Sequence, residues 1–517
     1  MSRRRPDLAA ERGVALLVVL MALAAGSALA AAILSAAGAD LPFAKASQDR
    51  KQAYAAAEAG LEYYMFQLSE NNDYWTLCDT VSGPVNQSWN RNQPDTRRWR
   101  TMPDGKSQYT IELLPVTGKN ACVPGATAHE TMLNLSSGTF RIRATGQAGS
   151  VTRSIVTTLR RQNFLDYIYF TDLETRDPAQ YPNPTDAAWA AENCAGPRAS
   201  RPGNCVNIQF AADDEINGPF HTNDDILTCG GTTFGRTKDD HIEVSGPAGW
   251  KNPSGCSGTP DFKGSWMPGA NPLNVPPSNA GLASIAEPQY TYTGKTTIHL
   301  NNTTMDVTTG PGQVKTTNVP LPPNGVIYVQ NGACTGVKTP LLQRYDDPIG
   351  CAVVYISGTY SKSLTIASAN DIVITGDVRR DVNADTVLGL IANNNVRVYH
   401  PVTRENWNDV DSCTNVTPGT MTDVTIDAAI LALTHSFTVD NYACGAALQK
   451  LNVTGAIAQK FRGAVGTTAR TGYLKNYVYD DRLKYRSPPY FLDPVQAAWK
   501  VNRSNEQVPA AAAAGAH

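Results

Sequence analysis

The chain has 517 residues, 17% of them charged, and a formal net charge of −2 at pH 7. That length predicts two or more domains, and the 41 Gly and 33 Pro residues favour turn-rich β structure over a helical bundle. Because the sequence has no dense basic patch, the composition excludes nucleic acid as an expected partner.

An apolar segment lies close to the N-terminus. No charged side chain occurs between Val14 and Ala39, and a leader with four arginines precedes this segment. As a helix it would be about 39 Å long, and a bilayer core needs ~20 apolar residues. The pattern predicts one membrane-spanning helix over 14–39, with the basic N-terminus in the cytoplasm.

Three interpretations of this segment are open. The first is a cleaved secretory signal, with the Ala-rich sequence Ala28–Ala32 at the cleavage site, although the apolar run is long for a signal. The second is a permanent membrane anchor. The third depends on a resemblance to a known protein family.

The string from Glu11 to Met21, ERGVALLVVLM, resembles the start of a type IV prepilin. In that family a peptidase cuts after the Gly, here Gly13, and the new N-terminal residue, here Val14, is methylated. The helix stays in the membrane until the subunit enters a filament. The fifth mature residue is usually Glu, and here it is Val18. Lacking that Glu is a trait of certain minor pilins and of the tip pseudopilin of type II secretion.

A second string, QAYAAAEAGLE over Gln52–Glu62, resembles the stretch after the membrane helix in PilX-like minor pilins. The resemblance implies a minor type IV pilin or pseudopilin whose long helix packs on a small antiparallel sheet. It implies other pilins or pseudopilins, the prepilin peptidase and the inner-membrane assembly platform as partners. The expected location is the bacterial inner membrane before assembly, and the periplasm or the pilus at the cell surface afterwards.

The helix is expected to span 14–70, with an amphipathic second half over 43–70. Pro42 is expected to kink or interrupt it. Glu58 and Glu62 should lie on its solvated face, with contact to the next subunit as the alternative. The apolar face is predicted from residues that step by three or four: Tyr54, Ala57, Leu61, Tyr64 and Leu68.

The sequence pattern over residues 71–160 predicts a small β domain after this helix. Its strands are expected where apolar and polar residues alternate, at Tyr109–Leu113, Phe140–Ala144 and Ser154–Leu159. A large β-rich domain is then predicted over residues 161–495. Residues 496–517 are predicted to form a tail with a disordered end. The fold class is therefore α+β.

Within the large domain, residues 245–320 read as loops and short strands decorating one side. From about residue 326, short apolar strands are separated by Gly, Asn or Asp. That spacing predicts a β-solenoid, with a β-sandwich as the alternative. The aromatic run over Tyr477–Leu492 is expected to cover the open end of the solenoid. Phe164–Glu174 and Gly218–Ile226 resemble parts of the large C-terminal domains of some PilX-like proteins.

The ten cysteines all follow the apolar segment, which predicts disulfides in an oxidising compartment. The sequence does not fix their connectivity. Neighbouring pairs are expected, such as Cys194 with Cys205 and Cys334 with Cys351, while Cys78 and Cys122 could staple the small domain. The alternative is that several are free buried thiols. The candidate cysteines are Cys78, Cys122, Cys194, Cys205, Cys229, Cys256, Cys334, Cys351, Cys413 and Cys444.

No nucleophile, metal or phosphate-binding motif occurs, so neither an enzyme nor a cofactor is expected. His221 lies near Asp224 and Asp225, but the polarity of a turn explains this group without catalysis. Weak Ca²⁺ binding by oxygen ligands stays open at four acidic clusters: Asp213–Glu215, Asp224–Asp225, Asp346–Asp347 and Asp480–Asp481.

Together these patterns predict a minor pilin or pseudopilin subunit at or near the tip of a type IV pilus or a type II secretion pseudopilus. It would act in assembly and in surface adhesion or cargo binding. The alternative is a membrane-anchored β-helix enzyme, or an adhesin, that acts on extracellular polysaccharide.

Overall fold

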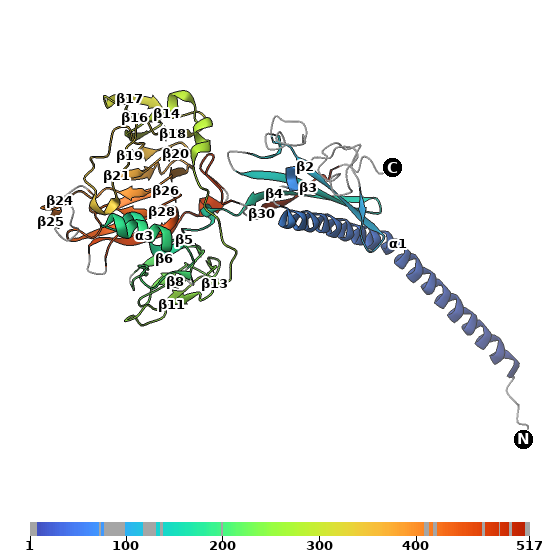
Figure 1. The fold of residues 1–517 in the computed structure, drawn as a ribbon. Helices are drawn as coiled ribbons and strands as arrows, with labels where there is room; N and C mark the ends of the chain where they lie inside the picture. Colours follow the sequence, from blue (N-terminus) through green and yellow to red (C-terminus); the bar gives the residue numbers. More distant parts are fainter. Residues whose placement is uncertain are drawn as a thin grey trace, which may run out of the picture. The chain divides into compact units, whose positions relative to one another are not determined.

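The computed structural model has a long N-terminal helix followed by mainly β structure, an α+β fold (Figure 1). The chain divides into two compact units: 1–132, 140–159 and 503–517 form the small unit, and 133–139 and 160–502 form the large unit. The structure describes residues 8–71, 74–76, 99–116, 131–134, 138–197, 200–212, 214–407, 413–416, 421–467, 471–484, 486–495 and 499–511.

Helix α1 of the small unit is continuous from Leu8 to Glu70, with Pro42 inside it. Of the two effects expected of Pro42, a kink or an interruption, the interruption is therefore wrong. Proline removes one N–H donor and crowds the preceding turn, but the other hydrogen bonds of the 63-residue helix hold it together. Figure 1 shows α1 changing direction partway along its length, as a proline inside a helix would favour.

A five-stranded sheet in the order β1-β2-β3-β4-β30 completes the small unit. Strands β2 and β3 pair antiparallel, from Ser107 opposite Ala148 to Leu114 opposite Arg141. The three predicted strands lie within β2, β3 and β4. The bounds are β1 Arg100–Thr101, β2 Ser107–Leu114, β3 Thr139–Ala148, β4 Val151–Arg161 and β30 Trp499–Gln507.

The last strand corrects the expected tail over 496–517, because β30 belongs to the sheet. Thr157 of β4 shares a 3.0 Å hydrogen bond with Ser504, and Arg143 donates to Gln507 at 2.8 Å. Beyond the strand, Ala511 donates its backbone N–H to the Ser154 hydroxyl at 3.0 Å. Most β30 side chains are exposed, so the strand has no apolar alternation that its sequence could reveal.

The large unit is built on parallel strand pairs that follow one another in a ladder. The ladder runs β18, β20, β22, β26, β28, β5, β7, β10 and β13, each paired in parallel with the next. Its strands are β18 Val326–Gln330, β20 Leu364–Ser368, β22 Leu388–Ala392, β26 Val424–Ala432, β28 Ala447–Arg462, β5 Tyr169–Arg176, β7 Phe220–Thr222, β10 His241–Val244 and β13 Ser265–Pro268.

One apolar residue of each strand stacks in register with its neighbours, and this stack forms the centre of the core. The next residue along several strands is also buried, in a second apolar cluster on the opposite face. Burial on both faces is typical of parallel sheets. The central stack is Ile327, Ile366, Leu390, Ile430, Ile457, Tyr169, Phe220, Ile242 and Trp266.

Two expectations about this unit are wrong. Stacked strands were expected from about residue 326, but β5, β7, β10 and β13 precede that point and extend the same ladder beyond β28. The aromatic run was expected to cover an open end. Its residues Tyr477 and Tyr479 instead belong to β29 (Gly472–Tyr479), which pairs with β28 and with β6 (Glu215–Asn217).

Candidate functional site

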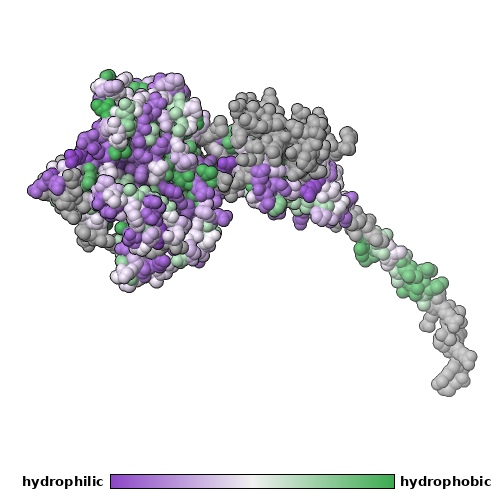
Figure 2. Space-filling model, viewed as in Figure 1, coloured by the Kyte–Doolittle hydropathy of each residue, from purple (hydrophilic) through white to green (hydrophobic). Residues whose placement is uncertain are grey.

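The first candidate site is the exposed apolar part of α1. Between Val14 and Ile33 its large apolar side chains are 53–65% exposed, and Figure 2 shows them as a hydrophobic band. By length and composition this segment could cross a membrane. The expected processing residues Gly13 and Val14 lie in the same helix, and Val18 is 58% exposed.

The second half of α1 packs against the sheet through very small residues. A Cβ atom added to Gly146 of β3 would lie 2.0 Å from the Ala53 carbonyl oxygen and 2.5 Å from the Ala57 nitrogen. On the helix, a Cβ atom on Gly60 would lie 2.8 Å from the Tyr109 ring of β2. The small residues of the QAYAAAEAGLE string therefore let helix and sheet approach closely.

The predicted apolar face of the helix is confirmed at Ala57, Tyr64 and Leu68, with Leu61 partly buried, and differs at its first residue. Ala53, Ala57, Tyr64 and Leu68 are buried, whereas Tyr54 is 36% exposed. The spacing of three and four residues selected Tyr54. On the buried face lie Ala53 and Ala56 instead, and the Ala56 Cβ atom is only 3.0 Å from the position of a Cβ atom on Gly146. Glu58 and Glu62 are exposed on the opposite face.

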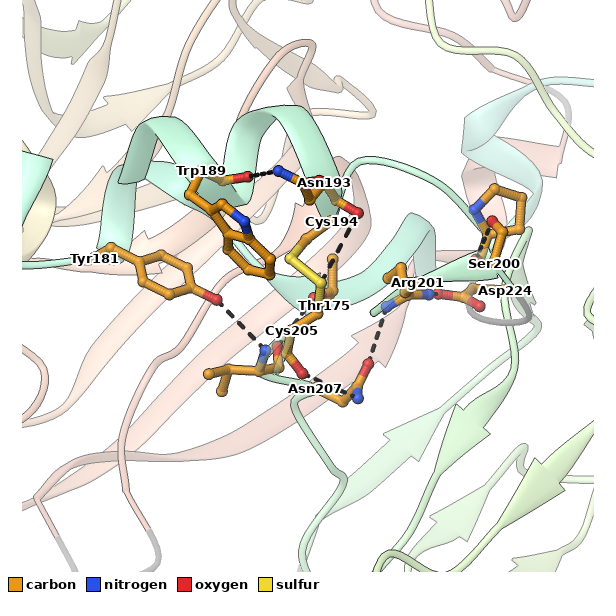
Figure 3. The surroundings of a disulfide bond; sticks show 12 residues. Thr175, Tyr181, Trp189, Asn193, Cys194, Ser200, Arg201, Cys205, Asn207 and Asp224 are labelled. Atoms are coloured by element: carbon orange, nitrogen blue, oxygen red, sulfur yellow. Dashed lines mark hydrogen bonds and ion pairs between the residues drawn. A yellow bond between two sulfur atoms is a disulfide. The ribbon is translucent and has the colours of Figure 1, made fainter. Parts of the chain in front are cut away.

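A disulfide anchors a second candidate site, in the large unit (Figure 3). Cys194 follows helix α3 (Pro184–Asn193) and is joined to Cys205, with 5.7 Å between their Cα atoms. Both cysteines are buried, and Tyr181 and Trp189 pack against them. The bond closes a short loop that carries Arg201.

The side chain of Arg201 is held by two partners. It forms an ion pair with Asp224, and each side chain is 2% exposed. It also donates to the Asn207 side chain at 3.0 Å (Figure 3). Asp224 in turn accepts the backbone N–H of Glu174 at 2.9 Å. The disulfide loop is therefore tied to the end of β7.

A cavity of about 430 Å³ lies beside this loop. Lys460 of β28 is in register with Asp172 of β5, and Asn223 and Ser245 immediately follow the paired ends of β7 and β10. These four residues therefore occupy neighbouring positions on four successive strands or at their ends. We call Lys460, Asp172, Asn223 and Ser245 the polar row. The cavity is lined by Asp172, Leu173, Ala195, Pro197, Asn223, Asp224, Ser245, Gly246, Pro247, Ala270, Pro272, Asn274 and Lys460.

The polar row is held by its own contacts. Lys460 forms an ion pair with Asp172. The Asn223 amide donates to Asp172 and to the Leu273 carbonyl, each at 2.8 Å, and its oxygen accepts the Leu273 N–H at 2.9 Å. Asn223 thereby holds the segment that follows β13 against the row.

His221 is fully buried and does not join Asp224 or Asp225 in an acid–base group. Its Nδ1 lies 2.9 Å from the Glu243 carboxylate, and its Nε2 lies 3.0 Å from the Asn223 oxygen. Burial opposes ionisation of Glu243, but its hydrogen bonds with His221 and Tyr167 outweigh this and lower its pKa. His221 therefore helps to fix the orientation of the Asn223 side chain.

A third polar group is buried around Arg397 of β23 (Val396–Val398), and one of its members, Asp347, lies in the chain that precedes β19 (Val354–Tyr360). Arg397 contacts Asp371 at 2.9 Å, Asp440 at 3.1 Å and Asp347 at 3.2 Å, and all four side chains are fully buried. Burial raises the pKa of Asp440 to about 7, although Arg397 opposes the rise. This group was missed because its members are far apart in the sequence.

The acidic clusters contact protein cations and N–H groups. Asp214 pairs with Lys475, Asp480 with Arg482 and Asp481 with Arg236. Asp225 accepts the Ala248 N–H at 2.9 Å. Asp213 lies outside the described residues. In the described part of the chain, no group of three or more His, Cys, Asp or Glu residues is placed to hold a metal ion.

Three further disulfides join cysteines that are neighbours in the sequence. They are Cys229–Cys256, Cys334–Cys351 and Cys413–Cys444, with Cα atoms 5.1, 4.4 and 5.7 Å apart. The Cys194–Cys205 and Cys334–Cys351 pairs are those expected from their spacing. Cys78 and Cys122 lie outside the described residues.

Comparison with known proteins gives little further guidance. No family model and no curated relative matches the chain. Among solved structures, it is similar to the crystal structure of the competence-associated pilin ComZ from Thermus thermophilus. The TM-score is 0.31 at 13% sequence identity, over 89% of this chain and 97% of that one. At that TM-score the likeness supports no inference, and we make none from it.

Proposed function

We propose that this chain is a minor pilin or pseudopilin that acts at or near the tip of a type IV pilus or a type II secretion pseudopilus. The observation that carries the proposal is the two-part character of α1. Its first half exposes apolar side chains over Val14–Ile33. Its second half packs closely on an antiparallel sheet through Ala53, Ala57 and Gly60. A helix of this kind can pass from a membrane into a filament core while the sheet stays outside.

The N-terminal sequence supports the same proposal. Peptidase cleavage between Gly13 and Val14 would leave the apolar helix at the new N-terminus, where methylation follows. Val18 stands where the resemblance implies Glu in bulk subunits. A subunit at the tip has no neighbour above it whose N-terminus such a Glu would neutralise.

We also propose that the large unit is a β-solenoid rather than a sandwich. The parallel pairing of successive strands and the in-register stack from Ile327 to Trp266 support this arrangement. A β-sandwich would be built mainly from antiparallel pairs. The stack would form a non-enzymatic body that contacts surfaces or cargo.

We propose different locations for the protein before and after filament assembly. Before assembly it would be a single-pass protein of the bacterial inner membrane, with its N-terminus in the cytoplasm and the assembly platform as its partner. The disulfides favour an oxidising periplasm for the rest of the chain. After assembly it would lie at the cell surface among other pilins or pseudopilins.

Mass spectrometry of the mature N-terminus tests the proposal. We expect a chain that begins at N-methylated Val14 in cells with the prepilin peptidase, and an intact leader in cells without it. A mature chain that begins near Ala30, or an intact leader in both strains, would contradict the proposal. Quantifying the protein in sheared filaments tests its place, because a tip subunit should be present far below the bulk subunit.

A further inference from the structure

The polar row beside the Cys194–Cys205 loop crosses several strands at one level. Lys460, Asp172, Asn223 and Ser245 belong to four successive strands of the ladder or to their immediate ends. Neighbouring strands are about 4.8 Å apart, so the row presents a polar group at each step. A ligand lying across the strands would meet these groups in turn.

The charges along the row largely cancel. Lys460 neutralises Asp172, and Asp224 is neutralised by Arg201 behind it. The side chains of Lys460 and Asp172 are 34% and 17% exposed, so both remain accessible from the cavity. Such a surface gives a polyanion or a polycation no net attraction. It presents hydrogen-bond donors and acceptors side by side instead.

The apolar part of the lining is aliphatic. It consists mainly of Pro197, Pro247, Pro272 and Leu173, with no aromatic residue. An amphipathic helix needs a continuous apolar groove, but the polar row interrupts the apolar lining of this cavity. A chain of hydroxyl groups fits better, because each hydroxyl both donates and accepts a hydrogen bond. The volume of about 430 Å³ is within the ordinary range for small-molecule sites.

The walls of the cavity are fixed before any ligand arrives. On one side, the disulfide and the Arg201–Asp224 ion pair hold the loop that contributes Ala195 and Pro197 (Figure 3). On the other side, Asn223 holds Leu273, beside Pro272. A site ordered in advance loses less conformational entropy on binding.

From these observations we infer that the cavity binds a neutral saccharide chain lying across the strands, with Lys460 and Asp172 as its central contacts. This inference deepens the proposed function, on which it rests, by naming the class of surface that the exported body would recognise. It requires no covalent step.

Binding to an oligosaccharide array tests the inference. The probe is the full-length chain in a detergent without a sugar headgroup, applied to neutral oligosaccharides of hexoses and N-acetylhexosamines and to anionic ones carrying uronic acids. We expect binding to at least one neutral oligosaccharide. The Asp172→Asn/Lys460→Met double variant, which keeps the side-chain shapes, should weaken that binding at least tenfold.

A matched control is available on the hairpin formed by β16 (Thr304–Thr309) and β17 (Val314–Pro320). Asp306 and Lys315 form an ion pair there at 3.1 Å, and Asp306→Asn/Lys315→Met should leave binding unchanged. A melting temperature equal to that of the wild type shows that the cavity variant is folded. If it is lower, the single Lys460→Met variant is tested, with the same expected loss.

Three results would overturn the inference: no neutral oligosaccharide binds, only anionic ones bind, or the cavity and control variants bind equally. Binding of extended peptides from a peptide array, lost in the cavity variant while saccharides fail, would also overturn it. Cleavage at Gly13 is measured separately. A chain processed at Val14 without saccharide binding removes this inference alone. An unprocessed chain that still binds the oligosaccharide removes the proposed function and leaves the saccharide site in place.

Discussion

Gly146 of β3 lies against Ala53 of α1 so closely that a Cβ atom on the glycine would be 2.0 Å from the alanine carbonyl oxygen. Backbone rather than a flexible side chain occupies that space, and the Ala57 nitrogen lies 2.5 Å from the same point. No small rotation of a side chain relieves such a contact. The distance between helix and sheet is therefore set by the absence of a side chain at one position.

We predict that Gly146→Ala destabilises the small unit by about 1–3 kcal/mol, the usual cost of overpacking. Chemical unfolding followed by hydrogen exchange of the amides in the second half of α1 measures the change. Gly281→Ala is the matched control, because a Cβ atom there meets nothing within 4 Å and its backbone is not left-handed. Equal protection of α1 in both variants would contradict the close packing.

The helix was predictable because its signals are long. The apolar run after Gly13 and the spacing of Tyr64 and Leu68 define an element of 63 residues. The buried face was harder to predict at its start, because the spacing favours Tyr54, whereas the close approach of the helix backbone to Gly146 favours small side chains such as Ala53 and Ala56. The size limit comes from Gly146, which is distant in the sequence.

The parallel ladder was predictable only where its strands are apolar over several residues, as in Leu388–Ala392. Earlier strands such as Phe220–Thr222 have three residues, too few to show a period. The candidate cavity, too, could be predicted from the sequence only in part. Its two closely spaced cysteines could be paired by inspection, but the contact between Lys460 and Asp172 depends on the register of β28 with β5.

The buried Arg397 group predicts a dependence of stability on pH. Burial raises the pKa of Asp440 to about 7 in the folded chain, whereas an unfolded Asp titrates near ~3.9. Between these values the folded state holds a proton that the unfolded state has released. The free energy of unfolding must therefore fall as pH rises through this window, by at most about 1.4 kcal/mol per pH unit.

Asp440→Asn mimics the protonated side chain and should remove this contribution. We expect its free energy of unfolding to exceed that of the wild type at pH 8, and the difference to shrink as pH is lowered towards 4. Urea unfolding of both proteins at four pH values measures the two slopes. Parallel curves would show that Asp440 is already ionised in the folded state. Glu192→Gln, a change at an exposed position of α3, controls for loss of a carboxylate.

The Cys194–Cys205 bond predicts a local effect of oxidation. It closes a loop over a sequence separation of 11 residues, and loops of that size give disulfides about 3 kcal/mol of stabilisation in the chain-entropy model. Cys194→Ser/Cys205→Ser should lower the stability of the large unit by about that amount. It should also speed hydrogen exchange over 200–207. Cys229→Ser/Cys256→Ser is the comparison, and it should leave exchange over 200–207 unchanged.

The C-terminal strand predicts that the small unit depends on the end of the chain. A chain that stops after Asn502 keeps only the first four residues of β30, and it loses the hydrogen bonds of Ser504 and Gln507 with β4 and β3. We expect a loss of about 1–3 kcal/mol, because only a few hydrogen bonds and little apolar area are removed. A chain that stops after Ala511 keeps every described contact of β30 and serves as the control. Thermal unfolding monitored by exchange of the β4 amides compares the two. Equal protection of β4 in the two chains would mean that residues 503–507 add nothing to the sheet. Intact β4 protection with lost protection of α1 would place the role of these residues at the helix instead.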